Sequence, residues 1–190
     1  MYKFFALLAA LAVTLNSGCA ATAVGAGAAG VGAAVDRRST GSFIDDEIIE
    51  VKAIVALGKD GPLWEQSHFN VTSYNGIALL SGETPSETLK ARAEQHVASV
   101  RKVRHVYNEV VIAAPSSVLS RSSDSYLTAK VKSALLTEKH IRANHVKVVT
   151  EAGTVFLMGM LNKAEAERAT AVARRVGGVQ RVIKLFEYQN

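Results

Sequence analysis

The stretches NVTSYNGIALLSG (residues 70–82) and KVVTEAGTVFLMG (residues 147–159) follow the same pattern in this chain. Each has a run suited to a β-strand, then a glycine, then a second apolar run that ends in another glycine. The central glycines, Gly76 and Gly153, are 77 positions apart, and so are the terminal glycines. This regular spacing indicates two copies of one structural unit.

The repeat extends on both sides of these stretches. Matches upstream of them lie 78 positions apart, and matches downstream lie 76 positions apart. The matched pairs are Ile49 and Leu127, Lys52 and Lys130, Ala56 and Ala134, Leu57 and Leu135, Val100 and Val176, Val103 and Val179, and Val106 and Val182. Because three segments keep the same order with slips of one residue, we interpret the chain as a tandem duplication.

Each copy predicts a helix followed by a hairpin. In the second copy, Leu127, Val131 and Leu135 recur at helical spacing and predict one buried face. In the first copy, Asn75-Gly76 lies between two apolar runs and suits a type I′ turn. The second strand of the hairpin is apolar on both faces, so we expect it at the centre of a sheet.

A second helix and a final strand complete each copy. The TPSE stretch at residues 84–87 predicts a capping box with Thr84 as the N-cap, and Asn162 with Glu165 predicts another. The final strand, over about 103–112 in the first copy, should run parallel to the strand before the helix. The predicted fold class is α+β: two αββαβ domains, each with two helices packed on a three-stranded mixed sheet.

The beginning of the chain predicts a lipoprotein signal peptide over residues 1–18. Lys3 is positively charged, and residues 4–15 form an apolar run that is too short to span a bilayer. Small residues precede Cys19, as in a lipobox, although Asn16 stands where leucine is typical. Cys19 is the only cysteine, which excludes an internal disulfide. We expect it to be acylated, with palmitate among its chains; a free structural thiol is the alternative.

Composition sets the remaining boundaries. Residues 19–44 comprise Cys19 and an Ala/Gly-rich tether, for which an apolar segment lying on the membrane is the alternative. We assign residues 45–114 to the first domain, 115–123 to a Ser-rich linker and 124–190 to the second domain.

The sequence contains no recognisable catalytic constellation. The histidines are His68, His96, His105, His140 and His145. No two have the i, i+4 spacing of a helical metal pair, so a metal site would need residues that converge over long range. The acidic residues at 45–50 are expected at a helix start, where they favour the helix dipole. Gly82 is expected to allow a helix to pack closely. We therefore predict no enzyme activity, no cofactor and no metal.

The two copies differ in charge at their first helices. Residues 45–57 carry four acidic residues and one lysine, whereas residues 124–142 carry two acidic and four basic residues. The whole chain has a formal charge of +5, which favours an anionic partner. Export excludes nucleic acid as that partner. An anionic surface would repel the first helix and attract the second.

The order of elements, the paired glycines and the late valines resemble the BON domain. The motifs NVT at 70–72, VYNE at 106–109 and VFLMG at 155–159 carry the resemblance. Two such domains behind a lipid-bearing cysteine are similar to the dual BON-domain outer-membrane lipoproteins. Ala20 after the cysteine resembles the residue found in outer-membrane members. The resemblance implies a periplasm-facing protein whose acyl chains lie in the inner leaflet of the outer membrane.

The resemblance also implies a function. The first helix of the second domain would bind anionic phospholipid, such as phosphatidylglycerol, and the protein would maintain envelope integrity at division sites. Transferred by position, the contact residues are Tyr126, Leu127, Lys130, Val131, Lys132 and Leu136. Alternatively, Tyr126 and Leu136 pack on the first domain or the linker. The second functional hypothesis is a protein-binding periplasmic adaptor for outer-membrane assembly, cell-wall remodelling or division proteins.

Overall fold

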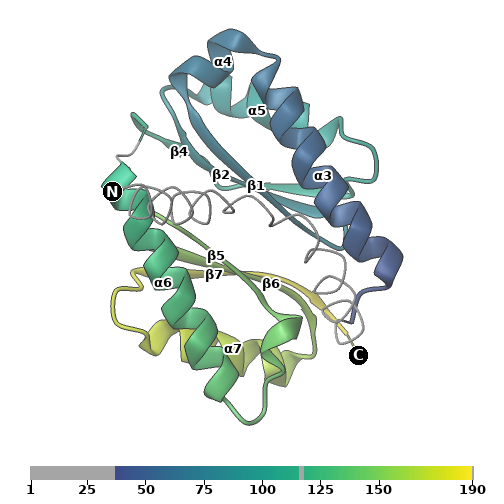
Figure 1. The fold of residues 1–190 in the computed structure, drawn as a ribbon, viewed down its shortest axis with the longest axis vertical. Helices are drawn as coiled ribbons and strands as arrows, with labels where there is room; N and C mark the ends of the chain where they lie inside the picture. The colour runs from purple at the N-terminus through teal and green to yellow at the C-terminus, as the bar shows by residue number, and fades with distance from the viewer. Residues whose placement is uncertain (1–36, 116–117, 190) are drawn as a thin grey trace, which may run out of the picture. The chain divides into compact units, whose positions relative to one another are not determined.

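The computed structural model describes residues 37–115 and 118–189, which form two α+β domains (Figure 1). The first domain comprises α3 (Thr40–Gly58), α4 (Gly61–Gln66), β1 (His68–Tyr74), β2 (Ile77–Thr84), α5 (Glu87–Ala98), β3 (His105–Asn108) and β4 (Val111–Ile112). The second comprises α6 (Val118–Thr137), the 3₁₀ turn η1 (Ala143–His145), β5 (Lys147–Glu151), β6 (Thr154–Leu161), α7 (Lys163–Arg175) and β7 (Arg181–Tyr188). The predicted αββαβ order is confirmed in both, with α4 and η1 as short additions.

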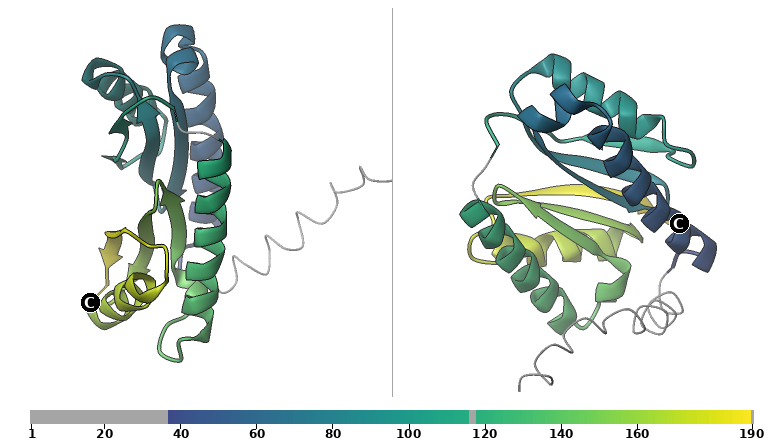
Figure 2. Two further views of the ribbon diagram at one scale, coloured as in Figure 1. Left: turned by 90° about the vertical axis from the view of Figure 1, so that its left-hand side faces the viewer. Right: turned by 45° about the horizontal axis from the view of Figure 1, so that its top comes forward.

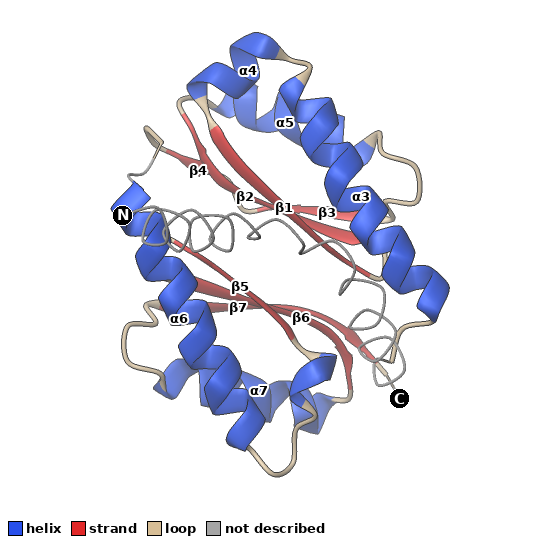
Figure 3. Cartoon of the chain, viewed as in Figure 1, coloured by secondary structure: helices blue, strands red, loops and turns tan. Residues whose placement is uncertain are grey.

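Both sheets are mixed, as predicted (Figure 3). β2 lies at the centre of its sheet, antiparallel to β1 and parallel to β3 and β4. β6 has the same place between antiparallel β5 and parallel β7. The final strand of the first domain is divided into β3 and β4, and the Glu109 N–H between them still donates to the Leu80 carbonyl oxygen.

Helices cover one face of each sheet (Figure 2). Ile49, Ala53 and Leu57 of α3 enter the core of the first domain, as their helical spacing predicted. Val131 and Leu135 of α6 enter the core of the second domain in the same way. The periodicity of the first helices therefore identified their buried faces correctly.

The opposite faces of the two sheets meet in a third hydrophobic cluster, which we call the seam (Figure 1). Its buried members are Tyr74, Leu79, Phe156, Met158 and Leu185. Alternate residues of β2 and β6 point into the seam, and the residues between them point into the domain cores. This explains why both central strands are apolar on both faces.

The first hairpin turn agrees with the type I′ prediction, and the second turn has the same form. Asn75 and Gly76 have φ angles of 52° and 75°, and Ala152 and Gly153 have φ angles of 46° and 71°. Positive φ at both central residues is what the type I′ turn requires. Glycine at the second position relieves strain, because L side chains rarely adopt this conformation.

Each turn is held by an aspartate of the first helix. Asp46 accepts hydrogen bonds from the backbone N–H groups of Asn75 and Gly76, at 2.7 and 2.8 Å. Asp124 accepts the equivalent bonds in the second domain, at 2.9 Å each. Our assignment of Asp46 and its acidic neighbours to a helix start was therefore wrong. α3 begins at Thr40 after the N-cap Ser39, and its first turn contains no acidic residue.

Three other local predictions differ from the structure. α3 and α6 start inside the segments assigned to the tether and the linker, at Thr40 and Val118. Thr84 belongs to β2, so the N-cap of α5 is Ser86, whose hydroxyl accepts from the Leu89 N–H. Gly82 makes room for a strand rather than a helix, since a Cβ there would collide with the His68 carbonyl oxygen. The predicted Asn162 capping box is confirmed.

Candidate functional site: the exposed face of α6

Two of the six proposed contact residues point away from solvent. Leu127 is 7% exposed, and Val131 is fully buried in the core of the second domain. Their helical spacing with Leu135 places them on the inner side of α6. The structure therefore gives Val131 a packing role, whereas Leu127 also lines a cleft at the edge of α6. The outer surface of the helix is made by the other four residues.

Tyr126 and Leu136 lie on the outer side of α6, where they are 69% and 72% exposed. They are ten positions apart, with the exposed residues Ala129 and Ser133 between them at helical spacing. Neither side chain is buried against the first domain or the residues before α6, as the packing alternative required. We call this surface, with Lys130 and Lys132, the α6 face.

The two lysines of the α6 face have different surroundings. The Lys130 ammonium donates to the Gly177 carbonyl oxygen at 2.6 Å and lies 5.6 Å from the centre of the Tyr126 ring. This contact holds the side chain beside an aromatic face at a weakly favourable distance. Lys132 is exposed, and none of the salt bridges within residues 37–115 and 118–189 involves it. Its charge is available to an anion in solution.

A cleft of about 510 Å³ opens beside Tyr126 and Lys130. The opposite wall consists of the loop between α7 and β7, which contributes Gly177, Gly178 and Gln180. Because two glycines line this wall, the cleft is not filled by side chains from that loop. The sequence reasoning missed these loop residues, although the Gly177-Gly178 pair was a visible indication of open space beside a helix end.

The equivalent cleft of the first domain is smaller and has a different lining. It measures about 310 Å³, and its charged lining residues are Asp45, Lys102 and Arg104. Asp45 pairs with Lys102 at 2.6 Å. The charged lining residues of the second-domain cleft are Asp124 and Lys130, and Tyr126 adds an aromatic side chain that the first-domain cleft lacks.

The two domains also differ in net charge. Residues 45–114 contain seven Lys and Arg against ten Asp and Glu, whereas residues 123–190 contain eleven against six. The second domain therefore carries a formal charge of +5 and the first a charge of −3. Electrostatic attraction to an anionic surface would favour contact through the second domain.

Two observations concern the relation of the chain to membranes. Cys19 lies outside the described residues, so its acylation stays a prediction. In the parts of the chain that the structure describes, no helix has both the length and the apolar character to cross a bilayer.

Comparison with known proteins identifies relatives along most of the chain. The BON domain family model matches residues 45–114 and 123–190. The chain is 38% identical to outer membrane lipoprotein DolP of Haemophilus influenzae, over 98% of this chain and 96% of the relative. It is 41% identical to a 21 kDa hemolysin of Actinobacillus pleuropneumoniae, over 81% and 79% of the two chains. It is 30% identical to osmotically-inducible protein Y of Escherichia coli, over 75% of this chain and 72% of the relative.

The αββαβ fold, its duplication and these matches agree. The chain belongs to the BON-domain family, with two BON domains in tandem and similarity to an outer membrane lipoprotein along nearly its whole length.

Proposed function

We propose that the protein is an outer-membrane lipoprotein, anchored through acylated Cys19, that binds anionic phospholipid through the α6 face and maintains envelope integrity at division sites. The observation that carries the proposal is the exposure of Tyr126 and Leu136 beside Lys132 on the more basic domain. Exposed aromatic and aliphatic side chains flanked by lysines suit the headgroup region of a bilayer.

Anchoring changes the affinity that the α6 face needs. A lysine near an anionic surface contributes about 1 kcal/mol, which alone gives weak binding. A protein already tethered to the membrane meets its lipid at a high effective concentration, so weak contacts suffice. The cleft beside Lys130 offers space for a polar headgroup, while Tyr126 and Leu136 enter the interface above it.

Vesicle flotation tests this proposal with a soluble form that comprises residues 36–190. This form keeps Ser39, the N-cap of α3, and Arg38, whose guanidinium pairs with Asp46 at 2.7 Å. We expect it to float with vesicles that contain phosphatidylglycerol. In the presence of neutral phosphatidylcholine vesicles, it should stay unbound at the bottom of the gradient. Binding should weaken as salt rises, because exposed charges are screened.

Lys132→Glu is the sharpest variant for this test. Reversing the charge should lower affinity for anionic vesicles about 30-fold, which corresponds to about 2 kcal/mol. Lys163→Glu makes the same charge change at an exposed position at the start of α7 and serves as the matched control. Equal losses in both variants would show a diffuse charge effect, and no loss in either would refute binding through the α6 face.

A second candidate function, a protein-binding adaptor, is favoured by an observation on α3. Ile44, Ile48, Val51 and Val55 form an exposed apolar stripe at helical spacing, between 43% and 64% exposed. The helix carries acidic residues beside this stripe, which makes it unsuited to an anionic membrane. A stripe of this kind is typical of protein interaction surfaces.

Paired variants separate the two candidates. Tyr126→Ala with Leu136→Ala should abolish flotation if lipid binding is the activity, whereas Ile48→Ala with Val51→Ala should leave flotation unchanged. Cells that carry each of these paired variants are then compared for their sensitivity to detergent. If only the α3 pair sensitises cells, the adaptor function is the essential one, and the lipid proposal fails as an account of envelope integrity.

A further inference from the structure

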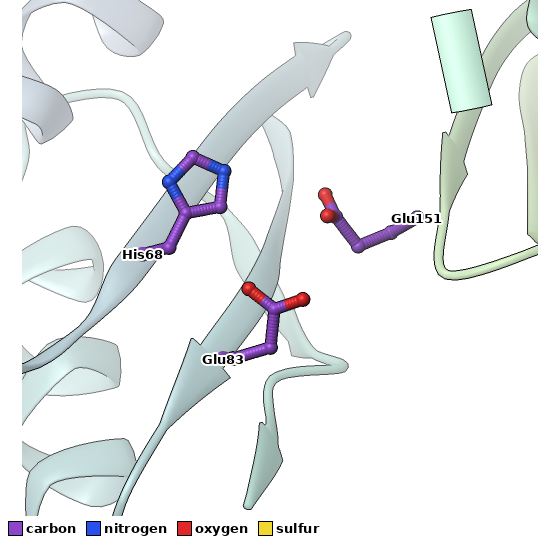
Figure 4. A group of neighbouring side chains, drawn as sticks. All are labelled: His68, Glu83 and Glu151. Atoms are coloured by element: carbon purple, nitrogen blue, oxygen red, sulfur yellow. The ribbon is translucent and has the colours of Figure 1, made fainter. Parts of the chain in front are cut away.

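A histidine and two glutamates meet at the edge of the seam. His68 is the first residue of β1 and pairs with Glu83 of β2 in the antiparallel register, so both side chains lie on one face. Glu151 ends β5 of the second domain. Each residue offers one ligand atom, and these three atoms lie within 4.8 Å of one another. Figure 4 shows the side chains pointing toward one another from the two domains.

Glu83 is the unusual member of this cluster. Glu83 is only 5% exposed. The Oε2 atom of its carboxylate is buried without a hydrogen-bond partner among the described residues. A buried carboxylate oxygen without a partner is costly unless the charge is compensated. Figure 4 shows this carboxylate directed toward the space between His68 and Glu151.

Glu151 adds a second buried acid at the same place. It is 8% exposed, and its Oε2 accepts a hydrogen bond from the Asn70 side-chain amide at 2.8 Å. Burial raises the pKa of this carboxyl group; the hydrogen bond from Asn70 lowers the pKa in part, and the nearby Glu83 raises it. No lysine or arginine of residues 37–115 and 118–189 forms a salt bridge with either glutamate. The two acids thus have no lysine or arginine counter-ion among the described residues, and His68 is the basic group that faces them.

We propose that His68, Glu83 and Glu151 together bind one divalent transition-metal ion, with Zn²⁺ as the best match, and that this ion clamps the two domains across the seam. Imidazole nitrogen and carboxylate oxygen are usual zinc ligands at about 2.0–2.2 Å. Such ligand atoms lie roughly 3.4 Å apart around a tetrahedral ion, so small side-chain rotations bring the three protein ligands into place, and water would take the fourth position. Mg²⁺ and Ca²⁺ prefer sets made of oxygen alone.

The site is separate from the α6 face and goes beyond the function proposed above. Asn70 would act as a positioning residue, because its hydrogen bond to one oxygen of Glu151 leaves the other oxygen for the ion. The ion would supply the positive charge that the buried acids lack. Because the ligands come from both domains, its binding free energy would add to the stability of the seam.

The duplication did not produce a second such site. The positions 77 residues away from the three ligands hold His145, Met160 and Tyr74, so the glutamates are absent there. Arginines approach that region instead: Arg37 donates to the Met160 carbonyl oxygen at 2.8 Å, and the Arg38 guanidinium lies 4.0 Å from the centre of the Tyr74 ring. We expected no metal site because the histidine spacing is not helical, but Glu151 of the second domain lies close to the paired residues His68 and Glu83 of the first.

Calorimetric titration with ZnCl₂ tests the proposal on the full-length chain, purified in detergent and stripped of metal with EDTA. The expected result is one Zn²⁺ per chain and a higher unfolding temperature when the ion is bound. Glu83→Gln and Glu151→Gln should each weaken binding about 100-fold or more, and Asn70→Ala should weaken it about tenfold. Because glutamine removes a buried charge without changing side-chain size, these variants should remain folded, as circular dichroism would show.

Exposed residues of the same types provide the controls. His140→Gln and Glu167→Gln should leave Zn²⁺ affinity unchanged, since both residues lie on the surface away from the seam. Absence of Zn²⁺ binding, or binding that both glutamine variants at the seam preserve, would overturn the proposal. Tighter binding of Ca²⁺ than of Zn²⁺ would do so as well. The same variants should float with anionic vesicles as the wild type does. The test of zinc binding is therefore independent of the test of lipid binding.

Discussion

Single aspartates connect the first helix of each domain to its hairpin. Asp46 and Asp124 are 78 positions apart, as are the matched apolar residues of the first helices. Each accepts two backbone N–H groups at the turn, so one carboxylate fixes the helix to the sheet. The pairing was present in the sequence but unrecognised, because an acidic residue near a helix is more often attributed to the helix dipole.

Asp124→Ala should therefore destabilise the second domain. It removes two charge-assisted hydrogen bonds to backbone donors, and the expected loss is about 2–3 kcal/mol. Asp46→Ala should cost more, about 3–5 kcal/mol, because it also removes the buried carboxylate partner of Arg38. Urea unfolding followed by circular dichroism measures both, and Glu47→Ala, at an exposed position of α3, should change stability by about 0.5 kcal/mol or less.

Asp60 should make the stability of the first domain depend on pH in the acid range. The hydrogen bond from His96 is the main cause that holds the pKa of this carboxyl below its ordinary value of 3.8, with further contributions from the Leu63 N–H and Arg92. A carboxyl with a lowered pKa in the fold stabilises it above the ordinary value, and this contribution is lost as pH falls below that value.

The comparison between wild type and Asp60→Asn tests this dependence. The variant should be less stable at about pH 6, and the difference should shrink at about pH 3, because the Asp60 carboxyl of the unfolded wild-type chain then takes up its proton while the folded state holds its proton less readily. Urea midpoints at the two pH values provide the measurement. A difference that stays constant with pH would mean that Asp60 contributes through packing and neutral hydrogen bonding.

At the scale of elements, α6 has two sides with different roles. The side that contains Leu127, Val131 and Leu135 packs against the sheet, and the side that contains Tyr126 and Leu136 faces solvent. All of these residues are hydrophobic or aromatic, so residue type alone does not separate them. Their spacing along the helix does, since buried and exposed positions alternate with the helical period.

Alanine substitutions should distinguish the two sides of α6. Leu135→Ala should destabilise the protein by about 2–5 kcal/mol, because it leaves a cavity in the core. Leu136→Ala, its direct neighbour in sequence, should change stability by about 0.5 kcal/mol or less, because its side chain is already in solvent. Thermal unfolding checks both. A large loss for Leu136→Ala would show that its side chain is covered in solution.

At the scale of the molecule, the seam joins domains that each have a complete core. Besides the apolar cluster, Lys147 of β5 donates to Glu50 of α3 at 2.6 Å, and Arg104 pairs with Glu187 at 2.9 Å. Each pair combines one residue from each domain. These contacts add specificity at the rim, while the apolar cluster supplies most of the favourable free energy.

Phe156→Ala should weaken the coupling between the domains. Phe156 is 2% exposed in the seam, and its truncation should cost about 3–5 kcal/mol. Because each domain keeps its own core, we expect the single unfolding transition of the wild type to separate into two in scanning calorimetry. Tyr188→Ala truncates an aromatic residue that is 54% exposed, and it should leave one transition. A single transition in Phe156→Ala would contradict independent domain cores.

Local sequence patterns were enough to identify the duplication, the order of elements, the type I′ turn of the first domain and the buried faces of the first helices. All of these depend on local periodicity or on residues close together in the chain, which are visible without coordinates. The six proposed contact residues, in contrast, came from a family resemblance, and packing divided them into buried Leu127 and Val131 and an exposed set.

The partner of the second face of each sheet became visible only in the complete fold. The apolar pattern of β2 and β6 predicted burial on both sides, but not that each would cover the other. The cluster of His68, Glu83 and Glu151 arose in the same way, because Glu151 approaches the paired residues His68 and Glu83 only when the two domains meet. The physical reason is common to both: contacts between distant strands depend on how complete domains pack, and local periodicity holds no information about that packing.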